Sequence, residues 1–321
     1  MISVKLPRVW RSLLPPGLTL ALGIFVFNLV QIDSYAQSAA SAAPEDAALG
    51  AAVESYFAAC DRKDLAGAVA LWSDRSPNLA AHKQSLQQLF ASEELSDGRP
   101  AISRIKVEGG KASLRATVAR TSINLKNRQK SERRLIINFE LVKEAGGWRV
   151  WRYVPAAEDL AEALVKTGSR TERSALLAQE RELVTGGLGP ALLTRGQQLF
   201  VQANYDQAKE IYELAVEIAE QGGDGKTMAG ALRGIGDVHR LHGDYARALE
   251  QLQKSLKISE DLGNKDGKTL IAYALNNIGG IYYGQGNYAG ALEYFQKSLK
   301  ITEEFGDMAA VSAGLNNIGE A

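Results

Sequence analysis

The sequence predicts a mixed fold, in which an N-terminal α+β domain is followed by an all-α solenoid. Two observations predict it. Between residues 101 and 154 apolar and polar side chains alternate, which is the period of half-buried strands. After residue 188 the chain repeats itself about every 40 residues, and a sustained repeat of this length is typical of stacked two-helix units.

The charge balance excludes some partner classes. Lys and Arg together number 37, as do Asp and Glu, so the formal net charge is zero. This balance offers no long-range attraction to nucleic acid or anionic lipid, so we expect no nucleic-acid partner. We expect contact with a membrane only if the N-terminal segment is retained.

No cofactor or metal site is predicted. Cys60 is the only cysteine, which excludes an intrachain disulfide and a cysteine-rich metal site, and we expect it to be a buried apolar residue. His239 and His242 lack an evident third ligand. Gly222–Thr227 resembles a phosphate-binding loop but has Glu220 where that loop needs glycine, so it is predicted to be a turn.

Residues 1–36 have the three parts of a secretory signal peptide. These parts are a basic start, an apolar run and small residues before the cleavage position (Lys5, Arg8 and Arg11; Leu18–Val30; Ser34 and Ala36). The run is shorter than the roughly 20 residues that span a bilayer, so we expect export to the periplasm or the extracellular space. An uncleaved membrane anchor is the alternative. Residues 37–48 are predicted to be a linker, and the lack of disulfides favours a bacterial protein.

Residues 49–155 are predicted to form the α+β domain. Ala51–Asp74 has the apolar spacing of two helices, and Gln84–Ser92 that of a third. Four strands follow, separated by glycine turns (Ala101–Val107, Ala112–Ile123, Ser131–Val142 and Trp148–Val154; turns at Gly109–Gly110 and Ala145–Gly147).

This order of helices and then a curved antiparallel sheet, closing with Phe139–Val154, resembles the nuclear transport factor 2-like fold, a cone with an internal pocket. Some members of that superfamily are isomerases or dehydratases with Asp or His in the cone. His82 is the only histidine of the region and lies in a polar stretch, so we expect it at the surface and predict no acid–base pair. We therefore expect a binding or homodimerising module, with a small-molecule enzyme as the alternative.

Residues 156–187 are predicted to be a helical linker that caps the first repeat. Residues 188–321 are predicted to hold three repeats and part of a fourth. "QKSLKI" occurs at Gln253–Ile258 and Gln296–Ile301, and "LNNIG" at Leu275–Gly279 and Leu315–Gly319. In the third repeat the two helices are predicted at Lys268–Tyr283 and Tyr288–Phe305, with glycines ending the second helices at Gly263 and Gly306. Residues in the apolar seam between hairpins are predicted to be Tyr245, Ala248, Tyr288 and Ala291.

The pattern in the third repeat resembles the tetratricopeptide repeat in a long variant of about 40 residues (Ile278, Gly279, Tyr282, Gly286, Tyr288, Ala291 and Phe295). The resemblance implies that the first helix of each repeat lines a concave groove that binds a partner peptide or helix. Carried over by position, the groove residues are Arg233, Asp237, Arg240, Tyr273, Asn276, Tyr283 and Asn316. The alternative is that the asparagines only hydrogen-bond to the neighbouring helix within the repeat.

The chain stops at Ala321, mid-way through a predicted fourth first helix, so we expect further repeats to follow in a longer protein. The run Ala175–Ala208 resembles the start of repeat arrays in large bacterial proteins, many of which end in a caspase-like protease module, the CHAT domain. This resemblance implies an alternative function, as the N-terminal regulatory or recognition part of such a protease. None of the protease module lies within these residues, so it assigns no catalytic residue here.

Overall fold

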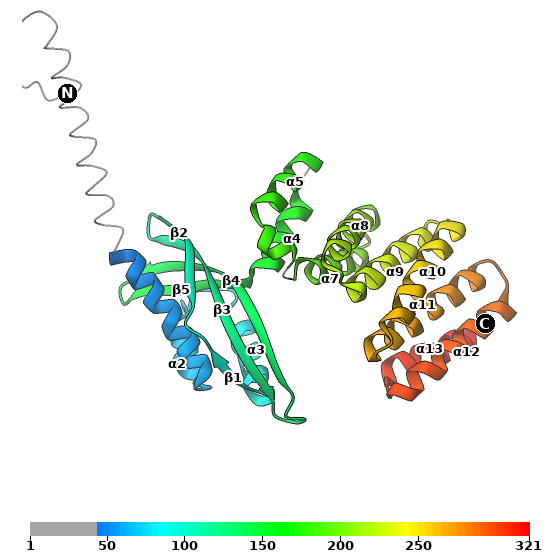
Figure 1. The fold of residues 1–321 in the computed structure, drawn as a ribbon, viewed down its shortest axis with the longest axis horizontal. Coiled ribbons are helices and arrows are strands. Elements are labelled where there is room, and N and C mark those ends of the chain that lie inside the picture. Colours follow the sequence, from blue (N-terminus) through cyan, green and yellow to red (C-terminus); the bar gives the residue numbers. More distant parts are fainter. Residues whose placement is uncertain (1–43, 168, 186) are drawn as a thin grey trace, which may run out of the picture. The chain divides into compact units, whose positions relative to one another are not determined.

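A computed structural model describes residues 44–167, 169–185 and 187–321 (Figure 1). The chain divides into two compact units, Met1–Tyr153 and Val154–Ala321. The predicted signal peptide lies outside the described residues, as does most of the predicted linker. Within the described part of the chain, no helix is both long and apolar enough to cross a membrane.

Among the described residues, three helices precede the sheet of the N-terminal unit. Residues 44–61 are helical, so the helix begins inside the segment that we predicted as a linker. It is followed by α2 (Leu65–Ala70) and α3 (Leu79–Ser92). Asp64 caps α2, because its side chain accepts a hydrogen bond of 2.8 Å from the Gly67 amide.

The sheet has five strands: β1 (Glu93–Asp97), β2 (Ala101–Glu108), β3 (Lys111–Asn124), β4 (Lys130–Glu144) and β5 (Gly147–Pro155). β1 and β2 share one edge of the long strand β3, and β4 pairs with its other edge. The four predicted strands are confirmed. β1 was not predicted, because it has only five residues and Leu95 is the single buried one among them.

The core of this unit lies between the helices and one face of the sheet (Figure 1). Alternate residues of β4 point into it, and Ile137, Phe139 and Leu141 are all buried, which follows from the period of two. Cys60 is also buried, as predicted. The glycine turn at Gly109 and Gly110 has φ values of +54° and +80°, a backbone region that residues with a Cβ rarely adopt.

The second unit is all helical. It begins with α4 (Ala156–Lys166), α5 (Arg170–Gln179) and α6 (Arg181–Val184). The helices of the repeats follow: α7 (Leu188–Val201), α8 (Tyr205–Gly222), α9 (Gly225–Leu241), α10 (Tyr245–Leu262), α11 (Lys265–Gly284), α12 (Tyr288–Phe305) and α13 (Met308–Glu320). Each packs against the next in chain order, so the predicted stack of hairpins is confirmed.

The helix ends follow the residues that we expected to stop them. Gly263 and Gly306 have φ values of +61° and +67° directly after α10 and α12, which is the left-handed C-cap geometry. Asp224 caps the start of α9 by accepting a hydrogen bond from Thr227. The segment that resembles a phosphate-binding loop is therefore the junction between two repeats.

Close helix approach explains the glycine of the first LNNIG. A Cβ at Gly279 would lie 2.7 Å from the ring of Phe295 on α12, so only glycine fits there. Ala248 and Ala291 are fully buried, as predicted for the seam. The prediction for Tyr288 is wrong: its side chain is 53% exposed, and its ring meets only the edge of Tyr283 among the described aromatic rings.

The predicted cap is made by α4 rather than by α5. α4 packs on α7, and the Val165 carbonyl accepts a hydrogen bond of 3.1 Å from Gln207 Nε2. In α5, by contrast, no residue is buried, and Leu176 and Leu177 are only half-buried.

Candidate functional site

The first helices of the repeats are joined by a row of side-chain hydrogen bonds. Asn277 Nδ2 on α11 donates to Asp237 Oδ1 on α9 over 2.7 Å, and Asn317 Nδ2 on α13 donates to Asn276 Oδ1 over 2.8 Å. The second asparagine of each LNNIG thus bonds to the first helix of the preceding repeat. These two asparagines have the structural role that we gave as the alternative, but across a repeat boundary.

Asp237 is the centre of a charge cluster on α9. Its carboxylate lies 3.2 Å from Arg233 Nη1 and 3.8 Å from Arg240 Nε, because these residues are four and three positions away on one helix face. The side chain of Asp237 is 13% exposed. Burial raises the pKa of Asp237, and the two guanidinium groups oppose that rise.

Two tyrosines stand out on α11. Tyr273 and Tyr283 are 38% and 39% exposed, a large fraction for aromatic side chains inside a helical stack. The Arg233 guanidinium lies 5.8 Å from the centre of the Tyr273 ring. The Tyr273 hydroxyl also donates to Asp307 Oδ2 at 3.4 Å.

A hollow of about 270 Å³ opens among these helices. Three of the predicted groove residues line it (Arg240, Asn276 and Tyr283). Asn316 is exposed and does not line the hollow, whereas its neighbour Asn317 does. The groove was predicted at the first asparagine of each pair and not at the second, since the repeat alone does not say which of two adjacent positions turns toward the preceding helix.

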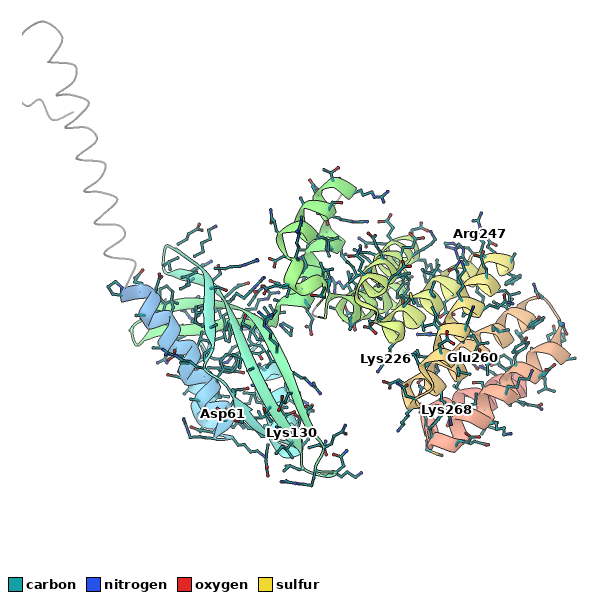
Figure 2. All side chains as sticks on the ribbon, in the orientation of Figure 1. Asp61, Lys130, Lys226, Arg247, Glu260 and Lys268 are labelled. Atoms are coloured by element: carbon teal, nitrogen blue, oxygen red, sulfur yellow. The ribbon has the colours of Figure 1, made fainter. Side chains whose placement is uncertain are left out.

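Exposed charges also lie on α9 and α10. Arg247 and Glu260 on α10 are both exposed (Figure 2), and Lys226 on α9 pairs with Asp266 of the next repeat at 2.9 Å. These residues form a solvated surface and offer matched control positions on the same unit.

A cavity of about 330 Å³ lies in the N-terminal unit. Its aromatic and polar lining comes from residues far apart in the chain (Tyr56, Trp72, His82, Arg120 and Tyr153). This pocket is partly open to solvent, because its lining also includes the exposed residues Asn78, Ala81 and Ser85.

The stretch around His82 is exposed, as predicted, but His82 itself is only partly exposed and lines this cavity. Its Nε2 lies 2.8 Å from the Tyr56 hydroxyl, and its ring stacks on Trp72 with centroids 4.4 Å apart. On α3, His82 shares a face with the buried Leu86, four residues later. That spacing is the sequence signal that was overlooked.

Burial shifts the pKa values of His82 and Tyr56. It lowers the pKa of His82 to about 4 and raises the pKa of Tyr56 well above its usual 10. Both side chains are therefore neutral near pH 7. They can donate and accept hydrogen bonds there, but neither readily changes its proton count.

A buried ion pair closes one side of the cavity. Arg120 Nε and Nη2 donate to the two carboxylate oxygens of Asp97, both at 2.6 Å. The side chains are 13% and 1% exposed, and the Asp97 amide donates to Asp61 at 2.7 Å. Because Asp97 lies on β1, missing that strand meant missing the ion pair.

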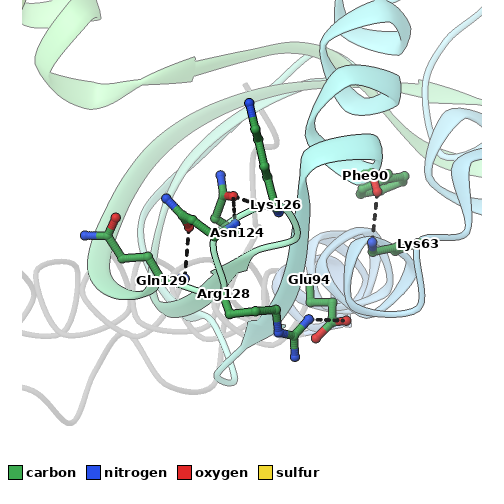
Figure 3. A network of polar contacts seen from close by, with 8 residues as sticks. Lys63, Phe90, Glu94, Asn124, Lys126, Arg128 and Gln129 are labelled. Atoms are coloured by element: carbon green, nitrogen blue, oxygen red, sulfur yellow. Dashed lines mark hydrogen bonds and ion pairs between the residues drawn. The ribbon is translucent and has the colours of Figure 1, made fainter. Parts of the chain in front are cut away.

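Polar contacts at and near the turn between β3 and β4 are shown in Figure 3, and most of them are exposed, unlike the Arg120 pair. Arg128 pairs with Glu94 at 3.3 Å, and the Asn124 side chain accepts from the Lys126 amide at 3.0 Å. Lys63 donates to the Phe90 carbonyl over 2.8 Å. The first two contacts are exposed and shape the turn, so we assign them a structural role.

In the residues that the structure describes, no group of three or more His, Cys, Asp or Glu side chains is placed to hold a metal ion.

Comparison with known proteins identifies the repeats. Residues 188–261 and 271–304 match two family models, each described as the tetratricopeptide repeat. The repeats of this chain are thus tetratricopeptide repeats, as the sequence predicted. No curated protein matches the chain.

Solved structures resemble the two units separately. A ketosteroid isomerase-like protein from Erwinia carotovora atroseptica is 20% identical with a TM-score of 0.31, over 33% of this chain and 91% of that one. A putative dehydratase of the NTF2-like family from Streptomyces avermitilis is 13% identical with a TM-score of 0.30, over 34% and 93%. A TPR-like protein from Chlorobium tepidum is 20% identical with a TM-score of 0.34, over 41% and 92%.

Proposed function

We propose that the tetratricopeptide repeats bind a protein partner, as an extended peptide or a helix, on the face formed by α9, α11 and α13. One observation carries the proposal: Arg240, Asn276 and Tyr283, from the first helices of successive repeats, surround a single hollow. A charged group, an amide and an aromatic ring around one concave site are the usual means of holding a peptide.

The exposed aromatic rings support this proposal. Tyr283 has 39% of its surface exposed, and burial of such a ring against a partner contributes strongly to binding. Asn276 already accepts one hydrogen bond from Asn317, which holds its side chain in place before a partner arrives. Such preorganisation lowers the entropic cost of binding.

A random peptide library displayed on phage, selected against the purified chain, tests the proposal. We expect selected peptides to lose affinity by about tenfold or more in Tyr283→Ala and in Asn276→Ala. Glu260→Ala, an exposed change on α10, serves as the control and should leave affinity unchanged. Peptides that bind all variants equally would remove the groove assignment.

We also propose that this binding takes place outside the cytoplasm. The support is the basic start, the apolar run Leu18–Val30 and the small residues Ser34 and Ala36. N-terminal sequencing of the mature protein from its native host should then begin at Gln37, whereas retention of Met1 would contradict cleavage. The link to a caspase-like protease, the continuation of the chain and homodimerisation through the N-terminal unit stay predictions.

A further inference from the structure

Another hollow of the repeats lies between α8, α9 and α10 and has a volume of about 430 Å³. On α9 it is lined by Leu232, Ile235 and His239, which the helical period turns away from the groove residues of the same helix. Leu232 and Ile235 are buried and form an apolar floor together with Val216 of α8. The rest of the lining is polar (Lys209, Glu213, His239, Arg247 and Gln251). This α8–α10 hollow is therefore a separate site from the groove.

The third repeat fills the equivalent place with its own side chains. In the register of the repeats, three polar lining residues correspond to a leucine and two tyrosines (Lys209 to Leu249, His239 to Tyr282 and Gln251 to Tyr294). The rings of Tyr282 and Tyr294 stack, with centroids 5.3 Å apart and an angle of 10° between their planes. Leu249 packs with them on the apolar core of that repeat. The chain itself thus shows that a place of this shape accepts an aromatic ring stacked on the first helix of its repeat.

His239 and Gln251 leave the α8–α10 hollow open and available for hydrogen bonds. Both side chains are partly exposed, and neither has a hydrogen bond to another of the described residues. Burial lowers the pKa of His239, and the nearby charges of Lys209 and Arg247 add to the shift. The imidazole is therefore neutral near pH 7, and a neutral, flat ring stacks readily on another aromatic ring.

The charges of the lining favour an acidic neighbour for such a ring. Lys209 and Arg247 are two cations against the carboxylate of Glu213, and Lys209 is paired with that carboxylate at 2.9 Å. The Arg247 side chain is 70% exposed and lies 3.3 Å from Asp244 (Figure 2). An ion pair this exposed contributes little, so Arg247 is free to turn toward a partner's carboxylate. The third repeat has Gly290 at the position of Arg247, so this cation is particular to the α8–α10 hollow.

We propose that the α8–α10 hollow binds a partner protein through a tyrosine side chain that has an acidic residue beside it. The ring lies on His239 in the way that Tyr294 lies on Tyr282. The amide of Gln251 exchanges a hydrogen bond with the tyrosine hydroxyl, and the neighbouring carboxylate pairs with Arg247. The site does not rest on the proposed peptide groove, and neither site needs the other to be occupied.

Three short peptides test the proposal by NMR titration of the full chain: acetyl-Glu-Tyr-Glu-amide, acetyl-Glu-Leu-Glu-amide and acetyl-Lys-Tyr-Lys-amide. The imidazole signal of His239 reports occupancy, and it is identified among the three histidines by its loss in His239→Gln. We expect the first peptide to bind about fivefold more tightly than the leucine peptide, because its ring stacks. It should bind about threefold more tightly than the lysine peptide, because its charges match those of the lining.

Gln251→Tyr closes the α8–α10 hollow with the residue that the third repeat has there. It should place a ring on His239 and weaken binding of acetyl-Glu-Tyr-Glu-amide by about tenfold or more. Gln253→Tyr, which is exposed on α10 and outside the lining, is the matched control and should bind like the wild type. Thermal unfolding followed by circular dichroism should show no loss of stability in either variant, so that weaker binding is not loss of fold.

Two further variants separate the parts of the site. Arg247→Ala should remove the preference for the glutamate peptide over the lysine peptide and keep the preference for tyrosine over leucine. Tyr283→Ala, which alters the proposed groove, should leave all of these affinities unchanged, whereas a loss there would place the peptides in the groove and overturn this site. No shift of the His239 signal, equal affinity for tyrosine and leucine, preference for the lysine peptide, or binding that survives Gln251→Tyr would also overturn the proposal.

Discussion

Arg120 in the N-terminal unit and Arg233 in the repeats both pair with an aspartate, but the pairs are built differently. Arg120 reaches Asp97 from another strand, 23 residues away, and both side chains are nearly sealed from water. Arg233 and Asp237 lie four residues apart on one helix and remain 24% and 13% exposed. In the repeats local spacing places polar groups on a face, whereas in the N-terminal unit only the folded sheet brings them together.

Of the changes that test this difference between the two ion pairs, the removal of Asp97 should have the largest effect on stability. Asp97→Ala leaves the Arg120 charge buried without its partner, so we expect the free energy of unfolding of the N-terminal unit to fall by about 3–5 kcal/mol. Urea denaturation followed by tryptophan fluorescence measures it, because all four tryptophans precede Val154 in the chain.

The exposed pair of Figure 3 is the control for Asp97. Glu94→Ala removes the partner of Arg128, whose side chain is 63% exposed, and should cost less than about 1 kcal/mol. Similar losses for both variants would show that the Arg120 pair is solvated.

Gly279 and Gly319 occupy the same position of the two LNNIG copies, so replacing each by alanine tests whether close helix packing, rather than repeat position, requires glycine. Gly279→Ala places a Cβ 2.7 Å from the Phe295 ring and should destabilise the repeats by about 1–3 kcal/mol. In a chain expressed to end at Ala321, Gly319→Ala, at the same position of the second LNNIG, meets no atom within 4 Å, and helix propensity should make it neutral or stabilising by up to about 1 kcal/mol. Denaturation followed by helical circular dichroism distinguishes the two, and equal effects would contradict close packing at Gly279.

Acidification should weaken the N-terminal unit through His82. Its pKa is about 4 in the folded protein against an ordinary 6.5, so the unfolded chain takes up the proton first as the pH falls. The contribution of His82 is present above pH 6.5 and is lost as the pH falls through 4. With allowance for partial solvent access, we expect a loss of about 2 kcal/mol.

His82→Gln isolates this effect, since the carboxylates titrate alike in the wild type and in the variant. The free energy of unfolding, measured by tryptophan fluorescence at pH 7 and near pH 4, should fall further in the wild type than in the variant. The same slope in both proteins would mean that His82 is open to water.

The smallest effect should come from the asparagines. Asn277→Ala removes the bond to Asp237 and should cost about 1 kcal/mol in the repeats. Asn316→Ala, at an exposed position, should stay within about 0.5 kcal/mol by the same denaturation. A larger loss of stability in Asn316→Ala than in Asn277→Ala would mean that the first asparagine of each pair has the structural role.

The repeat helices, their glycine ends and the four long strands could be predicted from the sequence, because each follows from spacing along the chain. β1 could not be predicted, because only Leu95 of its five residues is buried. His82 was expected at the surface, because the polar stretch around it outweighed its i, i+4 relation to Leu86. Tyr288 was misplaced because a seam residue is buried only where a neighbouring helix covers it.

The sequence by itself determined the order of α+β and repeat units, the helix boundaries and the positions where only glycine or alanine fits between helices. These features depend on side-chain size and on periods of two and about 3.6 residues, which are local. The tertiary structure alone decided which asparagine of each pair joins the repeats, and it gathered Tyr56, Trp72, His82, Arg120 and Tyr153 around one cavity. The physical reason is that burial and pairing depend on contacts between distant segments, and no spacing along the chain encodes those contacts.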